Sequence, residues 1–261
     1  MKHRLLWLPP GIALALAGLL WAADANVALF RLVNGMSAVT GKAPWPFVTI
    51  LGDTAVAIAL LTPLALRRPS LAWAIALGAV AATLMVHGCK PFFEVPRPPA
   101  VLDPASFTVI GPAHRSNAFP SGHTTTAFLA AGLLCLHHRS RTMWLAALSI
   151  ATLAGLSRAV VGVHWPMDIL VGAAGGWSCA VLGTRLATRW PWGWRASVHA
   201  VLVTIGLGCA LALLAGLKTG YPTAIPLQRA IASLVILDAI VMLLGAMGRR
   251  VEAGRPASGN G

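Results

Sequence analysis

The sequence predicts an all-α membrane protein, built as a polytopic bundle of helices. Hydrophobic residues make up 57% of the 261 positions, charged residues only 10%, and the mean hydropathy is +0.75. A soluble domain carries about 25% charged residues, so this composition excludes an ordinary water-soluble globule. Apolar runs recur along the whole chain, and several approach the ~20 residues that a helix needs to cross a bilayer.

The chain contains eight apolar segments, separated mostly by short polar or Gly/Pro-containing links. They cover residues 5–22, 46–66, 71–88, 122–136, 143–161, 166–184, 197–217 and 228–247. The first segment has a second interpretation, because a basic start followed by Ala23-Asp24-Ala25 also resembles a signal peptide with its cleavage site. We favour a retained span, and residue 26 lies outside in both cases.

Residues 27–40, VALFRLVNGMSAVT, place apolar side chains near helical period. This pattern predicts an amphipathic helix that lies along the outer membrane interface.

The basic residues orient the bundle. The net charge is +13, but the 20 Lys and Arg residues occur in twos and threes between apolar runs. This spacing argues against nucleic-acid binding, which calls for a basic stripe on one face. With a cytoplasmic N-terminus, twelve of these residues fall on the cytoplasmic side and eight on the opposite side. The positive-inside rule therefore places the long link 89–121 outside.

Three polar islands meet at this predicted outer boundary. They are KPFFEVPRP at 90–98, PSGH at 120–123, and the stretch LSRAVVGVHWPMDIL at 156–170. A charge at the bilayer centre costs at least ~2.5 kcal/mol, so these residues need water or a function. Each helical leg between His123 and Arg158 spans only ~22–25 Å, less than the ~30 Å hydrocarbon core. The predicted site therefore lies slightly below the outer surface, open to both water and lipid.

Three cations converge there with almost no carboxylate to neutralise them: Lys90, Arg97 and Arg158. Such a set predicts binding of a polyanion such as phosphate, which arginine grips through two parallel hydrogen bonds. Ser121 and Gly122 precede the run TTTAFLAAGLL, which predicts a helix N-terminus whose free N–H groups and dipole also favour phosphate.

Two histidines in separate surroundings suit a two-step phosphoryl transfer. His164 lies four residues before Asp168, so a helical turn started by Pro166 brings the carboxylate to its ring. A carboxylate on one ring nitrogen makes the other nitrogen the better nucleophile. His123, on a different helix, is then free to protonate the leaving oxygen and to activate water.

Each of these residues alone has a structural explanation. Lys90, Arg97 and Arg158 could each be a charge at the end of a span. His123 could cap a helix, and His164 with Asp168 could form a structural pair. Their joint occurrence at one depth favours chemistry. Three further polar residues lie in apolar segments. Asp53 either supports the cations of the site or contacts interfacial water. His87 lies close to Lys90 in the sequence. The sequence identifies no partner for Asp238.

The three islands resemble the signature blocks of one family. KPFFEVPRP fits K-x6-R-P, FPSGH fits P-S-G-H, and SRAVVGVHWPMD fits S-R-x5-H-x3-D. All three blocks are complete and occur in the family's order. The chain therefore resembles the type 2 phosphatidic acid phosphatase superfamily, which also includes vanadium haloperoxidases and bacterial acid phosphatases. The resemblance covers about residues 27–187, including LFRLVNG.

The resemblance implies a role for each matching residue. It implies that five residues bind the phosphoryl group: Lys90, Arg97, Arg158, Ser121 and Gly122. His123 would be the general acid, His164 the nucleophile that forms a phosphohistidine, and Asp168 its orienting partner. The resemblance assigns no role to Asp53 or His87, which remain candidates for supporting residues by their position in the sequence alone. The family is metal-independent, so we expect no metal and no cofactor.

The chain departs from the family in having two more apolar segments than the usual six. We expect a first span at 1–26, a phosphatase core with an outer-face active site at 27–190, and two additional spans with a short polar cytoplasmic tail at 191–261. Residues 99–119 are too few for a large lid domain.

The expected function is hydrolysis of a lipid phosphate or lipid diphosphate at the periplasmic face of a bacterial inner membrane. Undecaprenyl diphosphate, phosphatidylglycerol phosphate, phosphatidic acid and lipid A phosphate all qualify as substrates. Two alternatives remain: a lipid phosphotransferase that uses the same phosphohistidine, and a non-catalytic lipid-phosphate binder or transporter. The bilayer and its lipids are the expected partners, and the sequence leaves the oligomeric state open.

Overall fold

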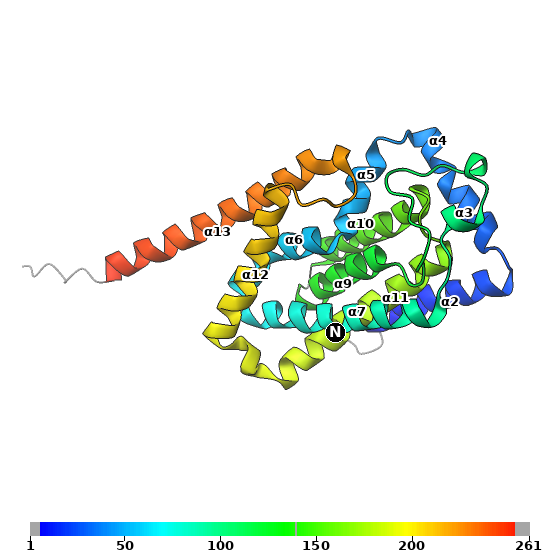
Figure 1. Ribbon diagram of the computed structural model, residues 1–261. Helices are drawn as coiled ribbons and strands as arrows, with labels where there is room; N and C mark the ends of the chain where they lie inside the picture. Colours follow the sequence, from blue (N-terminus) through cyan, green and yellow to red (C-terminus); the bar gives the residue numbers. More distant parts are fainter. Residues whose placement is uncertain (1–5, 139, 254–261) are drawn as a thin grey trace, which may run out of the picture.

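The computed structural model describes residues 6–138 and 140–253, with side chains up to residue 247, and these residues form helices and no strand (Figure 1). The α-helices are α2 (Leu8–Ala22), α3 (Asn26–Asn34), α4 (Met36–Thr40), α5 (Pro44–Thr49), α6 (Thr54–Arg67), α7 (Pro69–Phe93), α8 (Pro98–Val101), α9 (Gly122–His137), α10 (Arg141–Val160), α11 (Pro166–Arg189), α12 (Ala196–Leu214) and α13 (Ile225–Ala253). Short 3₁₀ turns are η1 (Ile50–Gly52), η2 (Pro104–Ser106), η3 (Pro191–Trp194) and η4 (Pro222–Ala224).

The helices match the predicted multi-pass membrane architecture. Among the described residues, five helices are long and apolar enough to cross a membrane, and up to seven if each of two bent pairs is one span. The remaining predicted span corresponds to α9, which has only 16 residues. It runs through the middle of the bundle between α7, α10 and α11 (Figure 1). A helix covered in this way needs fewer residues than one that meets lipid along its full length.

Small residues let α11 approach α9 closely. A Cβ atom on Gly172 would lie 2.8 Å from the carbonyl oxygen of Ser121, and one on Gly176 would collide with the carbonyl of Thr125. Glycines four residues apart on one helix face are typical of close packing between membrane helices. This contact holds the N-terminal ends of α9 and α11 side by side.

The span predicted at 46–66 is bent, whereas the sharp turn after α2 agrees with the separate helix predicted at 27–40. The segment Asn26–Thr40 turns 111° away from α2, and it divides at Gly35 into α3 and α4. The second predicted span bends by 67° between Pro44–Gly52 and α6. Asp53 lies at this bend in extended backbone and caps α6, because its carboxylate accepts hydrogen bonds from the backbone of Ala55 and Val56.

The last two helices, α12 and α13, pack against α6 and against each other, and α13 extends beyond the bundle (Figure 1). The contact with α6 is close, since a Cβ atom on Gly206 would collide with Thr62. Helix α13 continues to Ala253, so residues 251–253 at the start of the predicted polar tail are helical. The remainder of that tail lies outside the described residues, as do the basic residues Lys2, Arg4, Arg139 and Arg255.

Candidate active site

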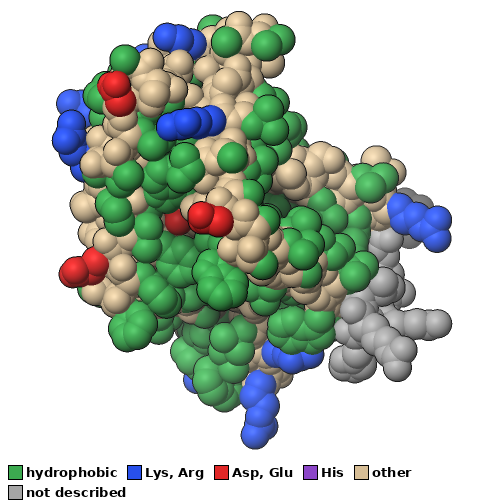
Figure 2. Space-filling view, turned by 90° about the vertical axis from the view of Figure 1, so that its right-hand side faces the viewer, with side chains coloured by type: hydrophobic (Ala, Val, Ile, Leu, Met, Phe, Trp, Pro, Cys, Tyr) green, Lys and Arg blue, Asp and Glu red, His purple; other side chains and the backbone are tan. Residues whose placement is uncertain are grey.

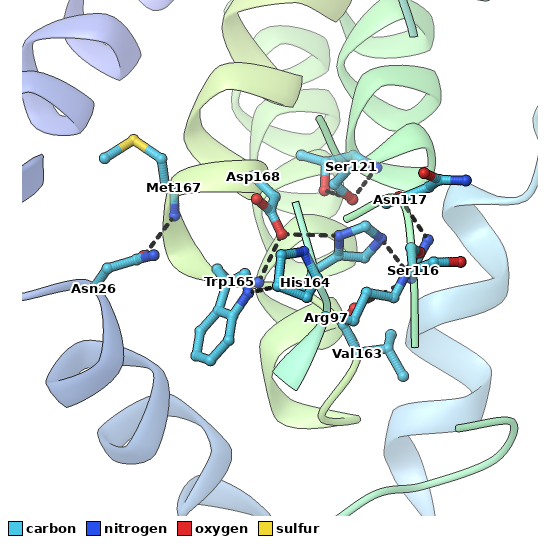
Figure 3. Close-up of polar contacts among 12 residues, drawn as sticks. Asn26, Arg97, Ser116, Asn117, Ser121, Val163, His164, Trp165, Met167 and Asp168 are labelled. Atoms are coloured by element: carbon cyan, nitrogen blue, oxygen red, sulfur yellow. Dashed lines mark hydrogen bonds and ion pairs between the residues drawn. The ribbon is translucent and has the colours of Figure 1, made fainter. Parts of the chain in front are cut away.

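The three sequence islands come together at one end of the bundle, where α7 ends, α9 begins and α10 connects to α11 (Figure 3). Figure 2 looks onto this end, where hydrophobic side chains cover much of the face and charged side chains stand in ones and twos. Five residues assigned to the site from sequence are buried: Arg97, Ser121, Arg158, His164 and Asp168.

His164 and Asp168 form the predicted pair. Pro166 starts α11, so Asp168 lies in its first turn, and its Oδ2 atom is 3.2 Å from Nδ1 of His164. The same oxygen accepts a hydrogen bond of 2.9 Å from the backbone N–H of Trp165. These two contacts fix the carboxylate against one edge of the imidazole.

Arg97 fixes the other edge of the ring and thereby its tautomer. Its Nη1 atom lies 3.0 Å from Nε2 of His164 and 3.1 Å from the carbonyl oxygen of Val163. A guanidinium group has donors but no acceptor, so Nε2 must accept and carries no proton. Nδ1 then carries the proton and donates it toward Asp168. The ring therefore lies between Asp168 on one edge and Arg97 on the other (Figure 3).

The surroundings keep His164 neutral. It lies in the link between α10 and α11, where burial, followed by the positive charges of Arg97 and Arg158, holds its pKa well below the usual value of 6.5. A neutral imidazole is the form that can attack as a nucleophile.

Backbone carbonyls hold Arg97 in place. Its Nε donates to Ser116 at 2.8 Å, and Nη2 donates to Asn117 at 3.3 Å. The backbone N–H of Arg97 also donates to the carbonyl of Arg115. The link between α8 and α9 therefore serves as a cradle for this one side chain.

Arg158 lies in the last turn of α10 and is 3% exposed. Its Nη1 donates to Oγ1 of Thr49 at 2.6 Å and to the hydroxyl of Tyr221 at 3.1 Å. Its Nε atom is buried and has no hydrogen-bond partner among the described residues. Its carbonyl oxygen accepts from the backbone N–H of His164, so the two residues are linked directly.

Ser121 and Gly122 lie at a helix start, as predicted. Ser121 is the N-cap of α9, and its hydroxyl accepts from the backbone and from the side chain of Thr124. Its own N–H donates to the carbonyl oxygen of Asp168 at 3.0 Å, which joins the second island to the third. The next two N–H groups of the helix, from Gly122 and His123, belong to the first turn and have no intrahelical acceptor.

A cavity of about 180 Å³ opens from this helix start between α6, α7 and α9. Its polar end is lined by His123, Gly122, Lys90 and His87, and its walls continue through apolar side chains such as Leu129. Nε2 of His123 is buried and has no hydrogen-bond partner in the part of the chain that the structure describes. His123 and Lys90 thus share one cavity, and His87 lies beside them as predicted.

Asp53 does not contact the cations of the site. Its carboxylate caps α6, and no ion pair of Asp53 is present among the described residues. No group of three or more His, Cys, Asp or Glu residues in the described part of the chain is arranged to hold a metal ion.

Sequence reasoning did not identify several residues that support the site. Asn34 is buried in α3, and its amide donates to the carbonyls of Ala159 and Val160 at the end of α10. Thr49 and Tyr221 hold Arg158. The stretch LFRLVNG was recognised, but the role of its asparagine was not. Tyr221 is the single tyrosine of the chain, which is the one signal that could have drawn attention to it.

Comparison with known proteins agrees with this geometry. The family model described as PAP2 superfamily matches residues 70–192, which contain all three islands. The crystal structure of Aquifex aeolicus LpxE superimposes with a TM-score of 0.57 at 30% identity, and the match covers 61% of this chain and 94% of that one.

Two curated bacterial proteins are similar over shorter stretches. Lipid A 1-phosphatase of Porphyromonas gingivalis is 44% identical over 70 residues, which is 26% of this chain and 16% of that protein. Phosphatidylglycerophosphatase B of Escherichia coli strain K12 is 43% identical over 77 residues, which is 28% of this chain and 30% of that protein. The chain therefore spans less than a third of the length of these relatives.

Proposed function

Because this chain belongs to the PAP2 superfamily, we propose that it is an integral-membrane phosphatase that acts on a lipid phosphate or lipid diphosphate. The observation that carries the proposal is the position of Nε2 of His164 against Arg97 while Asp168 lies at the opposite ring nitrogen, because these contacts require Nε2 to be the unprotonated one. An aligned neutral imidazole beside a surplus of positive charge suits attack on phosphorus.

In the first step, Nε2 of His164 attacks the phosphorus atom and the bond from phosphorus to the lipid oxygen breaks. His123 gives a proton to that leaving oxygen. Arg97 transfers its hydrogen bond from Nε2 to a phosphoryl oxygen as the new N–P bond forms. Asp168 stabilises the positive charge that develops on the imidazole.

In the second step, His123 takes a proton from water and the resulting hydroxide attacks the phosphohistidine. The N–P bond breaks, inorganic phosphate leaves, and His164 returns to its neutral form. Lys90, Arg97 and Arg158 neutralise the phosphoryl oxygens in both steps, and the free N–H groups at the start of α9 assist them. No metal ion takes part.

The cavity at His123 supports a substrate with an apolar chain. It reaches from Lys90 and His123 down to Leu133 on α9. The ten residues between His123 and Leu133 correspond to about 15 Å of helix. A lipid tail placed between α6, α7 and α9 would stay in the bilayer while its phosphate meets the histidines. The names of the two curated relatives point to lipid A 1-phosphate and phosphatidylglycerol phosphate as first candidates.

The proposed location is a bacterial inner membrane with the site facing the periplasm. Basic residues such as Arg67, Arg68 and Arg185 lie at or near helix ends opposite to the site. The positive-inside rule assigns that end to the cytoplasm.

The test is phosphate release from a panel of lipid phosphates and lipid diphosphates, with a water-soluble phosphate monoester as comparator. The protein is used in detergent with EDTA, as wild type and as His164→Ala. We expect the wild type to release phosphate without metal and to prefer lipids, and we expect a labelled phosphohistidine after rapid quenching at alkaline pH.

Release by His164→Ala at the wild-type rate would show that the nucleophile is wrongly assigned. If label moved to an added acceptor lipid instead of water, the protein would be a phosphotransferase. Loss of activity in EDTA that Mg²⁺ or Zn²⁺ restores would contradict the metal-free mechanism.

A further inference from the structure

The connection between α12 and α13 reaches the proposed active site. It carries Tyr221, whose side chain is 5% exposed and lies among apolar residues of α5 and of the α10–α11 link. Neither Tyr221 nor Thr49 belongs to residues 70–192, which match the family model. Two segments outside the signature region therefore meet at one side chain within it, Arg158.

The contacts of Arg158 divide its guanidinium group into two edges. Nη1 donates to both Thr49 and Tyr221, at 2.6 and 3.1 Å. Nε is buried and has no partner in the described part of the chain. Arginine binds phosphate best when two of its N–H groups point the same way, and fixing Nη1 orients the remaining edge.

Tyr221 also packs on the link that holds Arg97. A Cβ atom on Gly111 would lie 2.6 Å from the tyrosine ring, and one on Gly220 would lie 3.2 Å from Pro112. A few residues further along this link, the carbonyls of Ser116 and Asn117 hold Arg97. The Tyr221 ring thus contacts the link that holds Arg97, while its hydroxyl accepts a hydrogen bond from Arg158.

We propose that Tyr221 and Thr49 are positioning residues that orient Arg158 for the phosphoryl group, so that the connection between α12 and α13 supports the active site. This inference rests on the proposed function, because it assumes that the phosphoryl group binds at Arg158. The hydroxyl of each residue acts through the arginine and does not touch the reacting atoms.

The test measures binding of orthovanadate, which resembles the five-coordinate phosphorus of the transition state, to the full-length protein in detergent. Four variants are compared with wild type: Tyr221→Phe, Thr49→Val, Thr49→Ser and Thr219→Val. Tyr221→Phe keeps the ring on Gly111 and removes only the hydroxyl. We expect it and Thr49→Val each to weaken vanadate binding about 10-fold and to lower kcat more than they change KM.

Two of the variants serve as controls. Thr49→Ser keeps an acceptor for Arg158 and should bind vanadate within about 2-fold of wild type. Thr219→Val removes a hydrogen bond to Gln228 in the same connection without touching Arg158, so it should leave vanadate affinity unchanged. Melting temperatures show that each variant is folded, and Thr49→Val keeps the test valid if Tyr221→Phe is unstable.

The outcomes separate this inference from the proposed function. If the wild type releases phosphate from lipids while Tyr221→Phe and Thr49→Val bind vanadate as tightly as wild type, the inference is overturned and the function stands. If no lipid is hydrolysed but both variants still weaken vanadate binding, the function is overturned and the inference stands. A lower melting temperature with unchanged vanadate affinity would show a structural role alone.

Discussion

Two arginine-containing centres lie at opposite ends of this bundle. At the proposed active site, Arg97 and Arg158 are 8% and 3% exposed, and Asp168 is the carboxylate that lies with them. At the other end, Arg67 pairs with Asp238 of α13 through two hydrogen bonds of 2.7 Å, and both side chains are partly exposed. Asp238 therefore has the partner that the sequence did not identify.

The difference lies in charge balance and burial. Arg67 and Asp238 neutralise each other one to one, in the bidentate geometry that suits an arginine and a carboxylate, so this pair calls for no ligand. The other centre has more buried positive charge than negative charge, and buried charge without a partner is costly. A bound phosphoryl group would supply the missing negative charge. The candidate site is therefore distinguished by buried positive charge that no carboxylate balances, and not by the presence of arginine.

The largest effect that this comparison predicts is that of His164→Ala. It removes the proposed nucleophile, so kcat for release of phosphate from the preferred lipid should fall on the order of 10⁴-fold or more. Asp238→Asn, in the balanced centre, is the matched control and should stay close to wild type. Equal losses in the two variants would remove the distinction between the centres.

A smaller loss is expected for Arg97→Lys, which keeps the charge but loses the planar set of donors. Lysine cannot reach the carbonyls of Ser116 and Val163 and also meet Nε2 of His164 as arginine does. We expect kcat/KM to fall about 10²-fold. Arg67→Lys provides the comparison at the other end, and a similar loss there would contradict the assignment.

The buried His164 should make the stability of the protein depend on pH. The pKa of His164 lies well below 6.5 in the folded protein, because of burial and of the charges of Arg97 and Arg158. As the pH falls below 6.5, the unfolded chain gains a proton that the folded protein does not take up, so stability falls. The slope is at most about 1.4 kcal/mol per pH unit. Melting temperatures between pH 7 and pH 5 should fall less for His164→Gln than for wild type.

The smallest effect is expected from breaking the balanced centre. Arg67→Ala changes none of the contacts at the proposed active site. Partly exposed ion pairs also contribute little to stability. Lipid phosphatase activity should remain within about 2-fold of wild type, with a small decrease in melting temperature. A large loss of activity would contradict the separation of this ion pair from the active site.

The sequence predicted those parts of the site that depend on neighbours along the chain. Ser121 caps α9 because a serine before an apolar run satisfies the N–H groups of a helix start. Asp168 meets His164 because Pro166 begins a helix between them, which brings residues four apart together. The first island places Arg97 close to these residues, but its sequence does not show which carbonyls hold the guanidinium.

Contacts between distant segments were decided by packing. Thr49, Arg158 and Tyr221 lie on three different segments, and no local pattern connects them. Arg67 and Asp238 are 171 residues apart. The bend at Asp53 also depends on tertiary contacts, since Gly52 packs against the backbone of His123.

The sequence by itself determined the all-α membrane class, the three polar islands and the pairing of His164 with Asp168. Hydrophobic length and helical period act within one segment, so they can be read along the chain. The tertiary structure decided which donors of each arginine are occupied and which remain for a ligand. That choice depends on side chains brought together from separate helices, whose distances the sequence does not contain.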